Sequence, residues 1–373
     1  MRLEKLRAKM KDNNIDACLL STPESLYWLT GLNHWGYFTL HILIVPAEGN
    51  MHMVTREMER VTMETQLDAS VEFHGHRDNT TAVALATDVI KEIGLSDSII
   101  GLDLKSVSRS YKRTKELMDS LPSVDWQDSG NFVDQLRYVK SPLEIEAMRQ
   151  AAAISDHMTE TAIKMAQPGV NEKTIAAEVY KEMILAGGES PSFGPFLRPK
   201  DRLGEEHGTW GGEDLAADDR LFVELAGCYK RYHAPMGRFV YFDPPQDSGT
   251  VQKVCVEAFN AVIETMRPGN TADDVYQAWQ AVVNEAGLSE YKRHHCGYMT
   301  GMTFPPTWMQ DATDEVIGLR EGSTLVLEAG MTFHVLSWLV GSRIGDYFVS
   351  DTVLVTENGG EPLTKTTQNT LTA

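Results

Sequence analysis

The sequence is poor in cysteine, with four in 373 residues. These are Cys18, Cys228, Cys255 and Cys296, and no two of them form a Cys-x-x-Cys pair. The scattered pattern indicates neither a cysteine zinc site nor a framework of disulfides. Free thiols are typical of a reducing cytosol, so we expect a cytoplasmic protein.

Long apolar runs and positive charge are also scarce. No apolar stretch approaches the roughly 20 residues that span a bilayer. The first residues, MRLEKLRAKMKDNNIDACLL, are charged and lack the apolar core of a signal peptide. The formal net charge is −19, which disfavours nucleic acids and other polyanions as partners. We therefore expect neither a membrane nor a nucleic-acid partner.

What is present is typical of a folded protein of two domains. Hydrophobic residues make up 42% and charged residues 23% of the chain, which is an ordinary globular composition. The first third alternates predicted helices (2–13, 81–93) with predicted strands (17–20, 99–103), and a hairpin is predicted over 39–55. This alternation predicts an α/β domain over residues 1–135.

A helix with a clear start signal opens the second part. In SPLEIEAMRQAAAISDHMTETAIKMAQPG, Ser141 is a candidate N-cap and Pro142 suits the first helical position. Glu144 completes a capping box. Apolar residues keep a helical period until Pro168-Gly169 ends the segment.

An internal repeat follows this helix. Pro168-Gly169 and Pro268-Gly269 are 100 residues apart (268 − 168), and the Ala-Gly pairs at 186–187 and 286–287 have the same offset (287 − 187). Each copy reads as helix, Pro-Gly turn, helix and Ala-Gly cap. Two such halves in one domain imply a pseudo-two-fold axis with a site at the junction.

Four stretches in this order resemble the pita-bread family of methionine aminopeptidases, proline-specific peptidases and creatinase. They are RYVKSPLEIEAMRQAA, LFVELAGCYKRYHAPMGR, HHCGYMTGMTFPP, and LEAGMTFHV with FVSDTVLVTENGGEPLT. The resemblance implies an α/β N-terminal domain over 1–135. It also implies an α+β pita-bread catalytic domain with an internal pseudo-two-fold repeat over 136–373.

The metal ligands of that family do not carry over to this sequence. The family uses Asp, Asp, His, Glu and Glu, and the matching positions here are Glu224, Pro235, Tyr298, Glu328 and Ser350. Two carboxylates cannot hold two divalent ions, and proline has no side-chain donor atom. We therefore expect no metal and no other cofactor.

KRYHAPM, CGYxxGxxxPPxW and EAGMTFH resemble a metal-free branch of the family that contains ectoine hydrolase. This resemblance implies that Glu224 is the catalytic nucleophile. A charged residue in the apolar strand LFVELAG is also costly to bury unless it is paired or has a function. His207, seventeen residues before Glu224, matches the acid/base histidine of creatinase. Glu328 is expected to share the pocket, where it activates water or holds a substrate cation.

Further residues are expected to bind the substrate. Tyr298 can donate a hydrogen bond to a carboxyl group or an oxyanion, His233 is placed to line the pocket, and Trp308 can wall it against a flat cation. Trp35 and Tyr37, in the aromatic patch NHWGYF, fall where the family's partner subunit reaches into the site. This patch predicts a homodimer.

The sequence therefore predicts a metal-independent hydrolase of a non-peptide C–N bond in a small cationic or zwitterionic molecule. A cyclic amidine or amide is expected, with ectoine as the first choice and its ring opened to N-acetyl-diaminobutyrate. Three alternatives remain open at this point. They are a creatinase-like amidinohydrolase, an Xaa-Pro-type metallo-aminopeptidase with altered ligands, and a non-catalytic small-molecule binding protein.

Overall fold

The computed structural model describes residues 1–310 and 316–370, which divide into two compact units. The units are Met1–Arg137 and Tyr138–Ala373, so the division falls close to the predicted limit at residue 135. All four cysteines lie in the described part of the chain, and each is buried and free. No helix among the described residues is long and apolar enough to cross a membrane.

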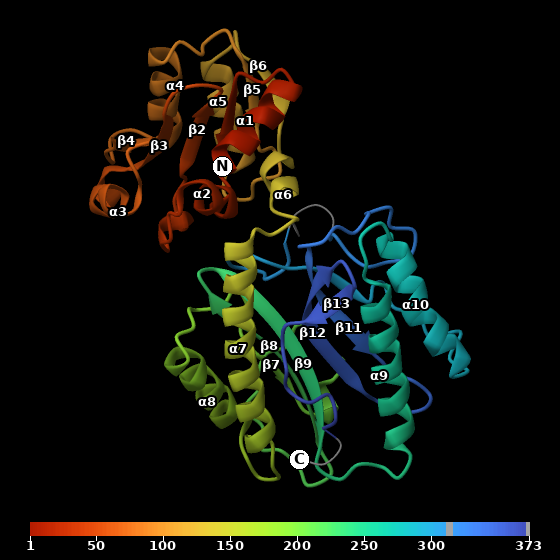
Figure 1. The fold of residues 1–373 in the computed structure, drawn as a ribbon. Helices are drawn as coiled ribbons and strands as arrows, with labels where there is room; N and C mark the ends of the chain where they lie inside the picture. The colour runs from red at the N-terminus through yellow and green to blue at the C-terminus, as the bar shows by residue number, and fades with distance from the viewer. Residues whose placement is uncertain (311–315, 371–373) are drawn as a thin grey trace. The chain divides into compact units, whose positions relative to one another are not determined.

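The N-terminal unit is built on a mixed six-stranded sheet with the order β4-β3-β2-β1-β5-β6 (Figure 1). Its strands are β1 (Ala17–Leu20), β2 (Ile42–Pro46), β3 (Met51–Arg56), β4 (Val71–His76), β5 (Ile99–Leu102) and β6 (Asp125–Asp128). Its helices are α1 (Arg2–Asp12), α2 (Pro23–Thr30), α3 (Arg60–Gln66), α4 (Ala82–Glu92), α5 (Tyr111–Ser120) and α6 (Phe132–Leu136). The apolar faces of α4 and α5 pack on the central strands and form the core.

The C-terminal unit is built on a curved antiparallel sheet with the order β10-β11-β12-β9-β8-β7, and β13 also pairs with β12. Helices α7 and α9 lie along one face of this sheet, and α8 and α10 pack beside them (Figure 1). The strands are β7 (Phe196–Arg198), β8 (Arg220–Tyr229), β9 (Tyr232–Tyr241), β10 (Gly297–Met299), β11 (Thr332–Trp338), β12 (Phe348–Thr356) and β13 (Gly359–Pro362). The helices are α7 (Pro142–Met165), α8 (Glu172–Leu185), α9 (Ser248–Thr265) and α10 (Ala272–Glu285).

The predicted capping box begins α7. The Glu144 carboxylate accepts hydrogen bonds from the backbone N–H and the hydroxyl of Ser141, at 2.8 and 2.7 Å. Its other oxygen accepts a hydrogen bond of 2.7 Å from the hydroxyl of Tyr232 on β9. One buried side chain therefore caps the helix and ties it to the sheet.

The predicted internal repeat is present in the backbone. Gly169 and Gly269 both have left-handed φ angles, +81° and +92°, at the turns between paired helices. The N–H of Gly169 donates to the carbonyl of Leu215 at 2.7 Å, and the N–H of Gly269 donates to the carbonyl of Leu327 at 3.0 Å. The two α-α-β-β halves are thus fixed by matching hydrogen bonds, as a pseudo-two-fold repeat requires.

Candidate active site

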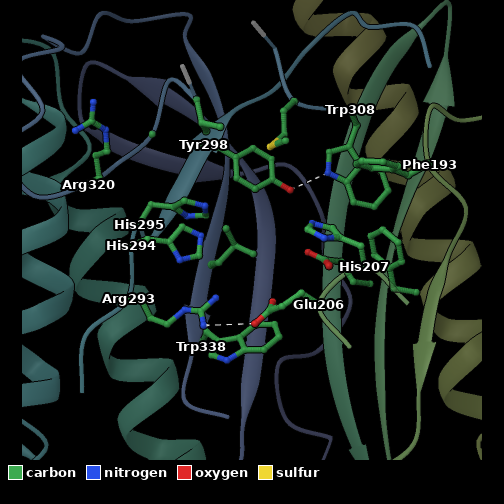
Figure 2. A pocket seen from close by; sticks show the side chains of 16 residues that line it. Phe193, Glu206, His207, Arg293, His294, His295, Tyr298, Trp308, Arg320 and Trp338 are labelled. Atoms are coloured by element: carbon green, nitrogen blue, oxygen red, sulfur yellow. Dashed lines mark hydrogen bonds and ion pairs between the residues drawn. The ribbon is translucent and has the colours of Figure 1, made fainter. Parts of the chain in front are cut away.

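The C-terminal unit contains a cavity of about 570 Å³ at the junction of its two halves. Figure 2 shows polar side chains entering it from several elements, with an aromatic group at one wall. The repeat predicted a site at this junction. The lining residues are Phe193, Phe196, Glu206, His207, Glu224, Arg293, His294, His295, Tyr298, Trp308, Met309, Val316, Gly318, Arg320, Leu336 and Trp338.

Glu224 lies in the middle of β8, between Phe196 on β7 and Gly237 on β9. The strand around it is buried and apolar, and Glu224 itself is 8% exposed. Burial raises the pKa of its carboxyl to about 7, the charge of Glu206 adds to the shift, and Arg198 opposes it. A carboxyl with this pKa exchanges a proton at neutral pH, as an acid, base or nucleophile at a reacting centre must.

His334 on β11 lies close to Glu224, but it is fully buried and does not line the cavity. Its Nε2 lies 3.9 Å from Glu224 Oε1. Burial lowers the pKa of His334 well below its ordinary value, so its imidazole is neutral and the contact is not an ion pair. A neutral imidazole here can donate or accept a proton in a hydrogen bond without adding charge to the pocket.

Three further side chains hold His334 in place. The Tyr298 hydroxyl lies 2.8 Å from His334 Nδ1 and accepts a hydrogen bond of 2.8 Å from Trp308 Nε1 (Figure 2). His334 Nε2 lies 2.7 Å from the Ser350 hydroxyl. One arrangement of protons satisfies every contact: Trp308 donates to Tyr298, Tyr298 donates to Nδ1, and Nε2–H donates to Ser350. This series of hydrogen bonds holds the imidazole ring beside Glu224.

His207 lines the cavity from the loop that precedes β8, and its side chain is exposed. Its ring packs edge-on to Phe196, with centroids 6.3 Å apart. Phe193 and Phe196 in turn pack against Trp308, at 4.9 and 5.6 Å. The predicted residues Glu224, His207, Tyr298 and Trp308 are thus brought together, with an aromatic wall beside them.

The cavity also carries cationic side chains that the sequence did not single out. Arg293 lies 3.9 Å from the Glu206 carboxylate (Figure 2) and stacks over Trp338 at 4.8 Å. Arg320 lines the same cavity. Guanidinium groups bind carboxylates through paired hydrogen bonds, so the pocket can hold an acidic group of a ligand as well as a cationic one. The sequence could have pointed to Arg293, because this residue directly precedes HHCGYMTG, part of a stretch that resembles the pita-bread family.

Glu328 does not join Glu224, contrary to the prediction. Its side chain is exposed in the turn before β11 and does not line the cavity. The repeat gives the reason: Glu224 lies nine residues after Leu215, and nine residues after the matching Leu327 is Leu336. Leu336 does line the cavity. The position related to Glu224 by pseudo-symmetry is therefore apolar, and we withdraw the catalytic role of Glu328.

His233 also lies apart from the cavity, where we expected it to bind substrate. It is fully buried, accepts a hydrogen bond of 2.9 Å from the Ser192 N–H, and lies 3.1 Å from the Thr303 hydroxyl. Burial lowers the pKa of its imidazole to about 3. These contacts make His233 a structural residue that joins β9 to two loops.

Trp35 and Tyr37 belong to the N-terminal unit. They lie at a short 3₁₀ turn, Gly36–Phe38, where Trp35 is 54% and Phe38 is 85% exposed. Tyr37 is half-buried and donates a hydrogen bond of 2.9 Å to the carbonyl of Leu32. The patch is therefore an exposed aromatic surface of this unit, and its place in a substrate site stays a prediction.

The donor atoms in the cavity do not suit a pair of metal ions. Of the carboxylates at family ligand positions, Glu224 lines the cavity. The raised pKa of Glu224 disfavours the ionised form that binds metals. Pro235, the candidate ligand position on β9, carries no side-chain donor atom. The hydroxyls of Tyr298 and Ser350 are engaged with His334. A dinuclear centre needs several anionic oxygens, which this set lacks.

Comparison with known proteins agrees with the fold. Residues 146–357 match the metallopeptidase family M24, and residues 2–139 match the creatinase/prolidase N-terminal domain. The prolidase from Thermococcus sibiricus has the same fold, with a TM-score of 0.86 at 20% identity over 100% of this chain and 98% of that one. The chain therefore belongs to the M24 family of pita-bread hydrolases.

Two curated relatives cover nearly the whole chain. Ectoine hydrolase of Halomonas elongata is 28% identical over 97% of this chain and 94% of that protein. The Xaa-Pro dipeptidase of Pyrococcus furiosus is 25% identical over 99% of each chain. The family and the hydrolase class are thereby fixed, and the relatives include both an ectoine hydrolase and an Xaa-Pro dipeptidase.

Proposed function

We propose that the chain hydrolyses a non-peptide C–N bond in a small cyclic amidine or amide, without a pair of metal ions. The observation that carries the proposal is Glu224, a buried carboxyl in the cavity wall with a pKa of about 7. Similarity to ectoine hydrolase over nearly the full chain supports ectoine as the first substrate to test. The expected product is then an N-acetyl-diaminobutyrate.

The charges in the cavity support a zwitterionic substrate. Arg293 and Arg320 offer cations that suit a carboxylate, and Glu224 offers an anion, when ionised, to an amidinium group. The aromatic wall around Trp308 suits a flat ring that carries delocalised positive charge. A substrate with both charges would bind in one orientation, with its amidine carbon towards Glu224.

The reaction begins when an ionised oxygen of Glu224 adds to the amidine carbon. The ring C–N bond then breaks, and its electron pair stays on the nitrogen, which takes a proton from His207. Water adds to the same carbon and gives a proton back to His207. The bond to Glu224 breaks, the amide is released, and the last proton leaves with the freed amine as an ammonium.

The substrate class is tested by a turnover screen of ectoine, hydroxyectoine, creatine and Xaa-Pro dipeptides, with and without chelator. We expect turnover of a cyclic amidine that chelator does not change. Hydrolysis of Xaa-Pro dipeptides that chelator abolishes and added metal restores would overturn the proposal in favour of a metallo-aminopeptidase. Tight binding of ectoine with no turnover over hours would favour a binding protein instead.

The role of Glu224 is tested with Glu224→Gln. We expect kcat to fall by roughly 10³-fold or more, as for other covalent nucleophiles. The matched control is Glu328→Gln, which should retain activity because Glu328 does not line the cavity. The wild-type kcat/KM should rise with pH through about 7, because only the ionised carboxyl attacks. Full turnover by Glu224→Gln would disprove the nucleophile role.

A further inference from the structure

Three possible metal ligands converge in the N-terminal unit, which does not contribute to the cavity described above. β3 and β4 run parallel, with His52 opposite Glu72 and Val54 opposite His74. His52 Nδ1 lies 3.1 Å from His74 Nε2 and 3.7 Å from Glu72 Oε2. Among residues 1–310 and 316–370, these three form the one group of histidine, cysteine and acidic side chains whose ligand atoms all lie within 4.8 Å of one another.

The spacing of these atoms suits a tetrahedral ion. Zinc–ligand bonds of about 2.0–2.1 Å place two ligand atoms about 3.3 Å apart in a tetrahedral site. The separations of 3.1 and 3.7 Å from His52 lie on either side of that value. All three ligand atoms lie within 4.8 Å of one another, so side-chain rotation can bring them onto one ion.

The donor chemistry points to a divalent transition metal. Two imidazoles and one carboxylate are ligands that zinc accepts, whereas Ca²⁺ and Mg²⁺ prefer oxygen alone. Asn50 Nδ2 donates a 2.9 Å hydrogen bond to Glu72, which orients that carboxyl. The half-exposed Glu72 side chain leaves room for water as a fourth ligand.

We propose that His52, Glu72 and His74 bind one divalent transition-metal ion of the zinc class. The ion would tie β4, the edge strand of the sheet, to β3. An edge strand gains most from such a tie, because one side of it has no strand partner. The inference does not depend on the proposed function, but it affects its test. One equivalent of zinc in a purified preparation would therefore not show that the catalytic site holds a metal.

The test uses the full chain stripped with chelator and titrated with Zn²⁺ by calorimetry. We expect one equivalent to bind and the melting temperature to rise with added Zn²⁺. His74→Gln and Glu72→Gln should each weaken binding by about tenfold or more. The matched control is His76→Gln, on the same strand but outside the group, which should bind as the parent does. Glu72 is exposed, so its variant keeps the test informative if His74→Gln fails to fold.

Two results would overturn the site. One is no binding by the stripped parent, and the other is unchanged affinity in both ligand variants. Substrate turnover by His74→Gln separates this inference from the proposed function. Loss of zinc with full turnover supports the site and leaves the metal-independent reaction intact. If His74→Gln loses turnover and added Zn²⁺ restores it, the proposal that the metal site is independent of the catalytic site is overturned.

Discussion

At the scale of single residues, Glu224 is the side chain on which the chemistry depends, and its burial also affects stability. Its carboxyl has a pKa of about 7 when folded, against an ordinary value of 4.5. The folded protein therefore holds a proton between these values that the unfolded chain releases. The contribution of Glu224 to stability is therefore highest below about pH 4.5, falls as pH rises towards 7, and levels off above it.

Glu224→Gln removes this titration. We expect the variant to gain stability over wild type at pH 8, by up to about 3 kcal/mol at 1.36 kcal/mol per pKa unit. At pH 4 it should gain little, because the wild-type carboxyl is then protonated in both states. Urea unfolding at the two pH values measures the difference. An equal stability difference at both pH values would mean that folding does not shift the pKa of the Glu224 carboxyl.

Tyr298 is expected to hold the site together through its hydroxyl. Tyr298→Phe would leave Trp308 Nε1 and His334 Nδ1 buried without this partner. The free energy of unfolding should fall by about 1–3 kcal/mol, the usual cost of a buried unsatisfied polar group. Denaturant unfolding measures it, and Tyr180→Phe, which removes a half-buried hydroxyl outside the cavity lining, is the control.

At the scale of helices and strands, the repeat leads to a paired prediction. Gly169→Ala and Gly269→Ala should each destabilise the fold by about 1–2 kcal/mol, because a side chain is strained at positive φ. A Cβ at either position meets no atom within 4 Å, so no steric clash adds to the backbone strain. Gly204→Ala is the matched control, since its site is equally open and its φ is not left-handed. If neither variant has a lower melting temperature than this control, the proposed backbone strain at Gly169 and Gly269 is disproved.

Elements with strong local signals were predicted well, and weak ones were missed. The hairpin of β2 and β3 and the helices α1, α4 and α7 lie where apolar period and turn residues placed them. β4 and β6 were not predicted. β6 reads DWQD and is mostly exposed, and β4 carries polar residues on one face, so neither shows a run of strand-forming residues. Pairing with neighbours in the sheet makes them strands.

At the scale of the whole molecule, we propose a homodimer in which the N-terminal aromatic patch meets a second copy of the chain. Trp35 and Phe38 are exposed there, and large exposed aromatic side chains mark interaction surfaces. Light scattering after size exclusion should give twice the chain mass, and Phe38→Ser should shift it towards one chain. Tyr111→Ser, another exposed aromatic residue of the same unit, is the control. A monomeric parent would disprove the proposal.

The sequence by itself determined the fold family, the two-part chain and the internal repeat. Each depends on which residue stands at a position in a local pattern: the Pro-Gly turns recur at a fixed offset, and a charged Glu224 stands out in an apolar strand. Only the tertiary structure decided which polar side chains lie close to Glu224. His334 lies 110 residues after Glu224 (334 − 224), and cross-strand register, which no local pattern reveals, brings them to 3.9 Å. The same register aligns Leu336 with Glu224 through Ser350 and Gly237, whereas Glu328 lies in the turn before β11, outside the paired strands.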